Sequence, residues 1–140
     1  MISKTGNAYG IGVLLENAET SFLSTDKEVT SIYKKVKSAN TGIIFNPLEF
    51  TKLKTHPFFH VFYHSKLKND IIFLRINDGL FLDGSPTLPA MGNSEMKELT
   101  SILLARGFSG YFSFVPYLDP MNLNQYVKVI DIFKKLLMEM

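Results

Sequence analysis

Short apolar runs alternate with segments of helical periodicity along most of the chain. Four runs have the hydrophobicity expected of strands that are buried on both faces of a parallel sheet, and the third is broken only by Arg75. They lie at Ile11–Leu15, Ile43–Phe45, Ile71–Ile76 and Gly110–Val115. A helical segment follows each run, and this alternation is typical of βα units joined by right-handed crossovers. The pattern therefore predicts an α/β fold of four consecutive βα units.

Capping residues mark the starts of the first two helices. Thr25 and Glu28 fit a capping box, in which the hydroxyl and the carboxylate satisfy free backbone N–H groups. Pro57 can open the second helix. The apolar positions after the capping box recur at helical spacing and predict one buried face, made of Val29, Ile32, Tyr33 and Val36.

The other two helices are expected in the last third of the chain, after a turn-rich loop at residues 77–93. The third helix runs from about Ser94 to Arg106 and ends at Gly107, a residue favoured after a helix C-terminus. Asp119-Pro120 supply a cap and a first turn for the last helix. The buried stripe expected on that helix is Leu123, Tyr126, Val127, Ile130, Phe133 and Leu137.

Length and composition agree with one folded domain. The chain has 140 residues, of which 46% are hydrophobic and 20% are charged, as in ordinary globular proteins. Residues 1–140 are therefore expected to form a single domain, with 1–9 as a lead-in to the first strand. The net charge of +2 is too small, and the lysines are too dispersed, to favour a nucleic-acid partner.

The absence of two sequence features bears on the compartment. The chain contains no cysteine, which excludes disulfides and thiolate metal sites. Its first ten residues do not resemble a signal peptide, and no apolar run reaches the roughly 18–20 residues that a membrane span needs. We therefore expect a cytoplasmic protein with no membrane partner.

Polar side chains follow the apolar runs. Glu16 follows the first run, Asn46 the second, and Asn77 and Asp78 the third. The carboxyl ends of parallel strands meet at one edge of the sheet, which in (β/α)8 barrels carries the active site. No glycine-rich phosphate loop follows the first strand, and this argues against a Rossmann nucleotide site. Asn77-Asp78-Gly79 also has the composition of a tight turn.

Five segments carry a resemblance to a known family. They are Gly10–Asn17 (GIGVLLEN), Gly42–Pro47 (GIIFNP), Ile71–Gly79 (IIFLRINDG), Met91–Lys97 (MGNSEMK) and Gly107–Pro116 (GFSGYFSFVP). In this order and spacing they resemble strands five to eight of the xylose-isomerase-like barrel superfamily, which includes sugar-phosphate isomerases and epimerases and the endonuclease IV type of DNA repair enzyme. The resemblance implies that the chain is the C-terminal half of a (β/α)8 TIM barrel.

The family's metal site is the part that this sequence changes. The resemblance places the metal-binding glutamate at Glu16, but Asn46 stands at an aspartate and Glu49 at a histidine. Arg75 stands at another histidine and Val115 at a second glutamate. A guanidinium stays protonated and has no lone pair to offer a cation. We therefore expect no metal and no other cofactor, although Glu16, Asn46 and Glu49 carry oxygens that suit a hard divalent cation.

Glu16 and Arg75 allow two interpretations. They form a charge-assisted pair that replaces the metal structurally, or Arg75 binds an anionic ligand such as a sugar phosphate. If the chain is active, the resemblance implies isomerisation or epimerisation of a small sugar, with Glu16 as the base and Arg75 as the electrostatic stabiliser. The alternative function is a non-catalytic binding or assembly module. The residues expected to contact a substrate are Asn46, Glu49, Asn77 and Asp78.

Three histidines offer a weaker candidate site. His56, His60 and His64 are four residues apart, and histidines at i and i+4 can bind zinc. The His-Glu-x-x-His pattern and a third ligand are missing, so we interpret them as a solvated helix face. The repair-nuclease function needs a multi-histidine cluster that this sequence lacks.

Four strands leave two sheet edges open. A complete barrel takes about 250 residues and closes its sheet so that no edge remains. Here the first and the fourth strands would both be edges, and both are apolar and uncharged, which favours pairing with other strands. We expect a homodimer or a complementing N-terminal half to supply the missing strands.

Overall fold

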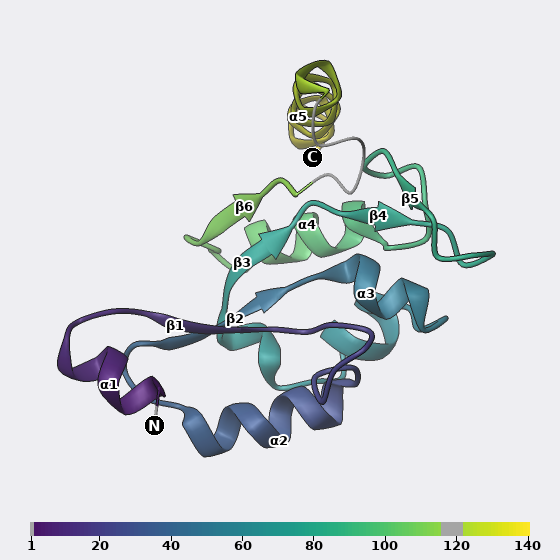
Figure 1. The fold of residues 1–140 in the computed structure, drawn as a ribbon. Helices are drawn as coiled ribbons and strands as arrows, with labels where there is room; N and C mark the ends of the chain where they lie inside the picture. The colour runs from purple at the N-terminus through teal and green to yellow at the C-terminus, as the bar shows by residue number, and fades with distance from the viewer. Residues whose placement is uncertain (1, 116–121) are drawn as a thin grey trace.

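A parallel sheet of four strands forms the centre of the computed structural model, which describes residues 2–115 and 122–140 (Figure 1). Each strand pairs in parallel with its neighbour, in the order β1-β2-β3-β6. The four predicted βα units are thus confirmed, and no strand bound differs by more than two residues from the predicted one. The strands are β1 (Val13–Glu16), β2 (Thr41–Phe45), β3 (Ile71–Arg75) and β6 (Tyr111–Ser113).

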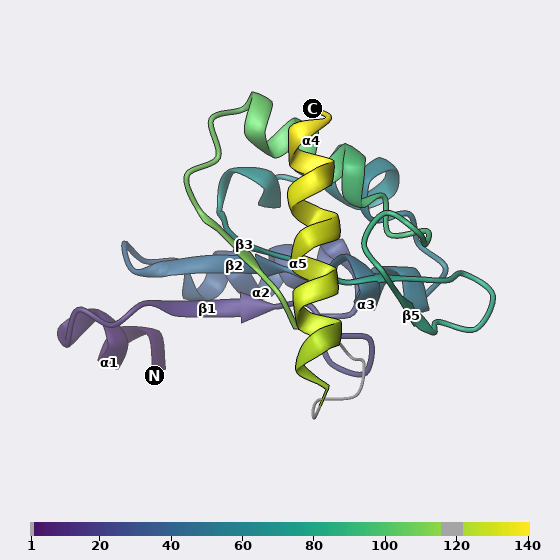
Figure 2. The same cartoon turned by 90° about the horizontal axis from the view of Figure 1, so that it is seen from above.

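Helices cover one side of this curved sheet. In Figure 1, α2 (Asp26–Val36) lies below the sheet, α4 (Met96–Ala105) behind it and α5 (Leu123–Met138) above it, and Figure 2 shows the same arrangement from above. Among the described residues, the concave face turned to the viewer in Figure 1 carries no helix. None of the helices within 2–115 and 122–140 is long and apolar enough to cross a membrane. The shorter elements on the helical side are α1 (Ile2–Ala8), α3 (Pro47–Lys52), the π-helical turn η1 (Pro57–Phe62) and the 3₁₀ turn η2 (Leu67–Asn69).

The apolar core lies between the sheet and these helices. Ile43 and Leu74 point toward the helices and are 1% and 0% exposed. The ring of Phe133 on α5 packs against Phe112 and Phe114, with ring centroids 5.1 and 5.5 Å apart. Because side chains alternate along a strand, the residues between these core positions face the opposite, concave side.

The predicted caps are present. Thr25 and Glu28 form the capping box of α2: the backbone N–H of Glu28 donates to the Thr25 hydroxyl (3.3 Å), and the Thr25 N–H donates to the Glu28 carboxylate (3.0 Å). Val29 and Tyr33 on the predicted face of α2 are buried. Gly107 follows α4 with a φ of +74°, a left-handed conformation that glycine adopts without a Cβ clash.

The stripe predicted for the last helix is partly wrong. Phe133 is buried as expected, but Leu123 and Val127 are 77% and 56% exposed. The helix presents Val129 and Leu136 to the core instead, because the contacts of Phe133 with β6 fix its rotation. The apolar spacing of the helix is compatible with more than one buried face, and the contacts of Phe133 select the one observed. The predicted cap at Asp119-Pro120 lies outside the described residues.

The segment between β2 and α4 contains more structure than predicted. Pro47 begins α3, which was not predicted; a proline is tolerated in the first turn of a helix. Pro57 opens a single π-helical turn rather than a regular helix, and the Tyr63 N–H donates to the Phe58 carbonyl five residues back. In the loop at 77–93, β4 (Asp78–Gly79) pairs antiparallel with β5 (Pro86–Thr87).

Candidate functional site

Four polar side chains meet at the carboxyl ends of neighbouring strands. Glu16 is the last residue of β1, Asn46 directly follows β2, and Arg75 is the last residue of β3. Ser113 ends β6 and is the register partner of Arg75, so both project from the same face of the sheet. We call Glu16, Asn46, Arg75 and Ser113 the Arg75 cluster. It lies on the concave face, where the parallel strands end.

Arg75 is the centre of this cluster. Its Nε donates to Glu16 Oε1 (3.0 Å) and its Nη2 to Glu16 Oε2 (2.8 Å), which is a bidentate ion pair. Its Nη1 donates to the Ser113 hydroxyl (2.6 Å), and Asn46 Nδ2 donates to Glu16 Oε1 (2.9 Å). The side chains of Arg75 and Glu16 are 21% and 31% exposed. The predicted contact between Glu16 and Arg75 is thus confirmed, and solvent still reaches both groups.

The main chain at the strand ends fixes this geometry. Asn17 Nδ2 donates to the Asn46 carbonyl, and the Asn46 N–H donates to Asn17 Oδ1, both at 2.8 Å. This reciprocal pair joins the end of β1 to the end of β2 in a buried position. These two hydrogen bonds of Asn17 hold Glu16 next to Asn46. The Glu16 carboxylate is thereby positioned to accept from Arg75.

The other predicted site residues lie around the cluster and have partners of their own. Glu49, on α3, accepts from Lys52 Nζ (2.7 Å) and from the Glu19 N–H (2.9 Å). The Asn77 amide, oriented by its acceptor surroundings, donates from its nitrogen to the carbonyl oxygens of Ile76 and Val115, at 3.0 and 2.6 Å. Both residues are buried and join neighbouring segments of the strand ends.

Asp78 anchors the long loop that follows β3. It is 1% exposed, and its carboxylate accepts three backbone N–H groups. The donors are Gly79 and Ser94 to Oδ1 (2.8 and 2.9 Å) and Gly92 to Oδ2 (3.0 Å). The turn interpretation of Asn77-Asp78-Gly79 agrees with these contacts, and the contacts place the carboxylate in a structural position.

Ser113 was missed by the sequence reasoning. The sequence places Ser113 on the fourth predicted strand, but its position opposite Arg75 follows only from the register of β3 and β6. The histidines lie elsewhere, on and near η1, where His56 Nδ1 is 3.4 Å from Glu95 Oε1. In the described part of the chain, no group of three His, Asp or Glu side chains is arranged to hold a metal ion.

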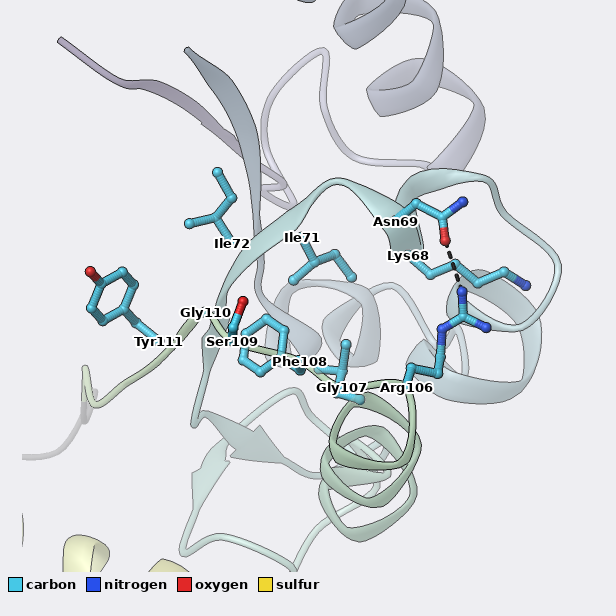
Figure 3. A pocket seen from close by; sticks show the side chains of 11 residues that line it. Lys68, Asn69, Ile71, Ile72, Arg106, Gly107, Phe108, Ser109, Gly110 and Tyr111 are labelled. Atoms are coloured by element: carbon cyan, nitrogen blue, oxygen red, sulfur yellow. Dashed lines mark hydrogen bonds between the residues drawn. The ribbon is translucent and has the colours of Figure 1, made fainter. Parts of the chain in front are cut away.

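A cavity of about 370 Å³ opens at the opposite, amino end of the sheet (Figure 3). It is lined by Lys68, Arg106 and Phe108 among others, and Arg106 Nη2 donates to Asn69 Oδ1 (2.8 Å) across its rim. In βα barrels the amino end of the strands serves stability and the carboxyl end serves chemistry. The Arg75 cluster is therefore the better candidate site.

Comparison with known proteins identifies the fold. No family model matches the sequence, and no curated protein matches it. Among solved structures, a D-tagatose 3-epimerase-like protein superposes with a TM-score of 0.78 at 24% identity, covering 97% of this chain and 50% of that chain. A xylose isomerase domain protein from Planctomyces limnophilus gives 0.76 at 15% identity, covering 96% and 48% of the two chains.

A third structure, the IolI protein with a zinc atom, gives a TM-score of 0.72 at 18% identity, covering 99% of this chain and 51% of that chain. The described chain thus has the fold of a xylose-isomerase-like TIM barrel, and it spans about half the length of the solved barrels that it matches. It is half of a (β/α)8 barrel, as the sequence resemblance implied. The numbering of its strands as five to eight stays a prediction.

Proposed function

We propose that this half-barrel binds a small sugar or sugar phosphate at the Arg75 cluster, with the Arg75 guanidinium in the place that a divalent cation takes in metal-dependent relatives. The observation that carries the proposal is the bidentate contact between Arg75 and Glu16, the one residue of the family's metal site that the sequence keeps. The names of the solved neighbours, an epimerase-like protein and a xylose isomerase domain protein, support a sugar as the ligand class.

The donor set does not suit a metal ion. Both oxygens of Glu16 already accept from Arg75, and Glu16 Oε1 also accepts from Asn46. A divalent cation would have to displace a guanidinium from its carboxylate and would then lie beside that positive charge. Glu49 is engaged by Lys52, at 2.7 Å. The positive charge that neutralises Glu16 at this site is therefore the Arg75 guanidinium, and not a metal ion.

The same arrangement favours recognition over proton abstraction. A guanidinium presents planar N–H donors that match the oxygens of a phosphate or of neighbouring hydroxyl groups. Both oxygens of Glu16 already accept hydrogen bonds from Arg75, so a substrate proton would have to compete with the guanidinium for them. The non-catalytic binding module is the function that this geometry supports best.

An isomerase or epimerase activity is the second candidate. It is favoured by the partial exposure of both charged groups, because a substrate can reach them from the mouth of the sheet. Glu16 would then remove a proton beside a carbonyl, and Arg75 would stabilise the negative charge that develops on the oxygen. Turnover of a ketose by the purified protein, lost in Glu16→Gln, would favour this candidate over simple binding.

Thermal melting tests the proposal, because a ligand of the native state must raise its melting temperature. We expect no shift with Mn²⁺, Mg²⁺ or Zn²⁺, and no stoichiometric metal by elemental analysis. We expect a shift with a member of a ketose and ketose-phosphate panel, and its loss in Arg75→Leu. The other arginine, Arg106, provides a matched control at the far end of the sheet: Arg106→Leu should respond like the wild type. A stoichiometric metal, or equal ligand shifts in both variants, would contradict the proposal.

A further inference from the structure

The concave face of the sheet is largely apolar and has no cover within the described chain. Leu14, Ile44, Ile72 and Phe73 lie on it and are half-buried, and Tyr111 is 63% exposed. We call these five residues the concave apolar face. On the same strands, Ile43, Phe45 and Leu74 point to the helices and are buried.

Register and side-chain contacts place these residues on one face. Phe73 pairs with Tyr111 in the register of β3 and β6, and their rings stack with centroids 4.8 Å apart. A Cβ atom added to Gly42 would collide with the side chains of Ile72 and Leu14, which close over this glycine. The face is therefore a continuous apolar layer across all four strands, next to the Arg75 cluster.

Both edges of the sheet are also unpaired among the described residues. The strand order ends at β1 on one side and at β6 on the other. Each edge strand presents a row of backbone N–H and C=O groups that can pair with another strand. Beside the β1 edge, Ile2, Tyr9 and Ile11 are 75%, 77% and 61% exposed and line an apolar hollow of about 310 Å³. Because the hollow includes Val13, which alternates with Leu14 on β1, it lies on the α1 side of that strand. The concave face and the two open edges make up the uncovered surface.

We propose that a second copy of this chain covers this surface and closes the sheet into an eight-stranded barrel. A two-fold axis parallel to the strands would place β1 of each copy beside β6 of the other, in parallel, so that both edges gain a partner. This arrangement needs four parallel strands from each copy, which is what the chain has. The solved barrels with this fold are about twice its length, in agreement with a missing half of equal size.

Charge on the surface permits self-association. Glu16 and Arg75 neutralise each other within one copy, so two concave faces meet without net repulsion between these groups. The remaining contacts would be apolar side chains of the kind that fill the interior of a (β/α)8 barrel. The closed barrel would carry two Arg75 clusters at one mouth. The proposal depends on the uncovered surface and not on sugar binding, so either can fail without the other.

Light scattering after size exclusion, at tens of micromolar protein, tests the proposal. We expect a mass of twice the 15.9 kDa chain for the wild type. Tyr111→Lys should give the single-chain mass, because it puts a charge on an exposed position of the concave face. Leu14→Lys, on the opposite edge strand, is a second variant with the same expectation.

Leu104→Lys is the matched control, since Leu104 is an exposed leucine (41%) on α4, on the outer side of the sheet. It should keep the wild-type mass, and circular dichroism should show native helix content in all four proteins. A folded wild type of single-chain mass overturns the proposal and leaves a different four-unit half as the occupant. Dimers in both lysine variants of the concave face, or dissociation by Leu104→Lys, overturn it as well.

Discussion

The two faces of the sheet differ in burial and in chemistry, although their residues alternate along the same strands. On β3, Leu74 points to the helices and is completely buried, whereas its neighbours Phe73 and Arg75 point to the concave side and are only half-buried. The helical face is covered by helices of the same chain, and aromatic rings of α5 and β6 are in contact there. The concave face carries the charged cluster and an uncovered apolar layer.

This difference separates what holds the chain together from what it presents to others. A buried apolar face supplies the free energy of folding, and its residues need only shape and hydrophobicity. The concave face keeps costly features: a partly buried ion pair and exposed aromatic and aliphatic side chains. Such features are retained where a ligand or a partner uses them, and the proposals above assign one to each.

The comparison predicts the largest effect for a core truncation. Leu74→Ala should lower the free energy of unfolding by about 2–5 kcal/mol, because it leaves a cavity among fully buried side chains. Phe73→Ala, one residue away on the concave face, should cost less than half as much in dilute solution, since its ring is still partly solvated. Urea denaturation of both variants measures this.

Protein concentration sharpens the same test. If a second copy covers the concave face, the cost of Phe73→Ala should grow with protein concentration, while the excess cost of Leu74→Ala should not. Equal losses for the two variants at low concentration would mean that the two faces are equally buried, and the comparison would fail.

The second effect concerns the ion pair. Arg75→Leu should lower the free energy of unfolding by roughly 1–3 kcal/mol, because it leaves the Glu16 carboxylate half-buried beside an apolar side chain. Adding Glu16→Gln should recover part of this loss, since the uncompensated charge is then removed. Arg106→Leu, at the amino end, should change stability by less than about 0.5 kcal/mol. Arg106→Leu as harmful as Arg75→Leu would contradict a special role for the cluster.

The sequence predicted the covered face better than the concave one. The apolar runs, the capping box at Thr25 and the stop at Gly107 act through local physics, and each appears in the structure. The contact between Glu16 and Arg75 was also foreseen, because both stand at strand ends that a parallel sheet must bring together. Local signals and strand direction were sufficient for these features.

The wrong or missing predictions concern features that tertiary contacts determine, such as the rotation of a helix and the register of two strands. The rotation of α5 depends on Phe112 and Phe114, which lie outside the helix, so the spacing within the helix assigned Leu123 and Val127 to the wrong side. Ser113 joined the site only through its register with Arg75, which a single sequence does not specify. The short pairing of β4 with β5 gave no hydrophobic alternation to detect.

The smallest effect lies on the covered side, at the capping box of α2. Hydrogen bonds from the Ser24 hydroxyl, and then from the Thr25 hydroxyl and N–H, lower the pKa of Glu28 below its ordinary value. A carboxyl whose pKa is lower in the folded state binds its proton more readily when unfolded. Its contribution to stability is therefore complete above the unfolded pKa and is lost as the pH falls through the folded pKa.

Melting temperatures measured from about pH 6 down to about pH 3 test this contribution. Glu28→Gln keeps a hydrogen-bonding side chain at this position but cannot titrate, so its melting temperature should fall less steeply over the acid range than that of the wild type. Lys27→Gln, in the same turn, should keep the wild-type slope because it leaves the Glu28 carboxylate and its hydrogen bonds in place. The capping box is on α2, on the helical side of the sheet, so Glu28→Gln should leave the oligomeric mass and any ligand shift unchanged. An acid slope identical to that of the wild type would mean that this carboxylate stabilises α2 no more when charged than when protonated.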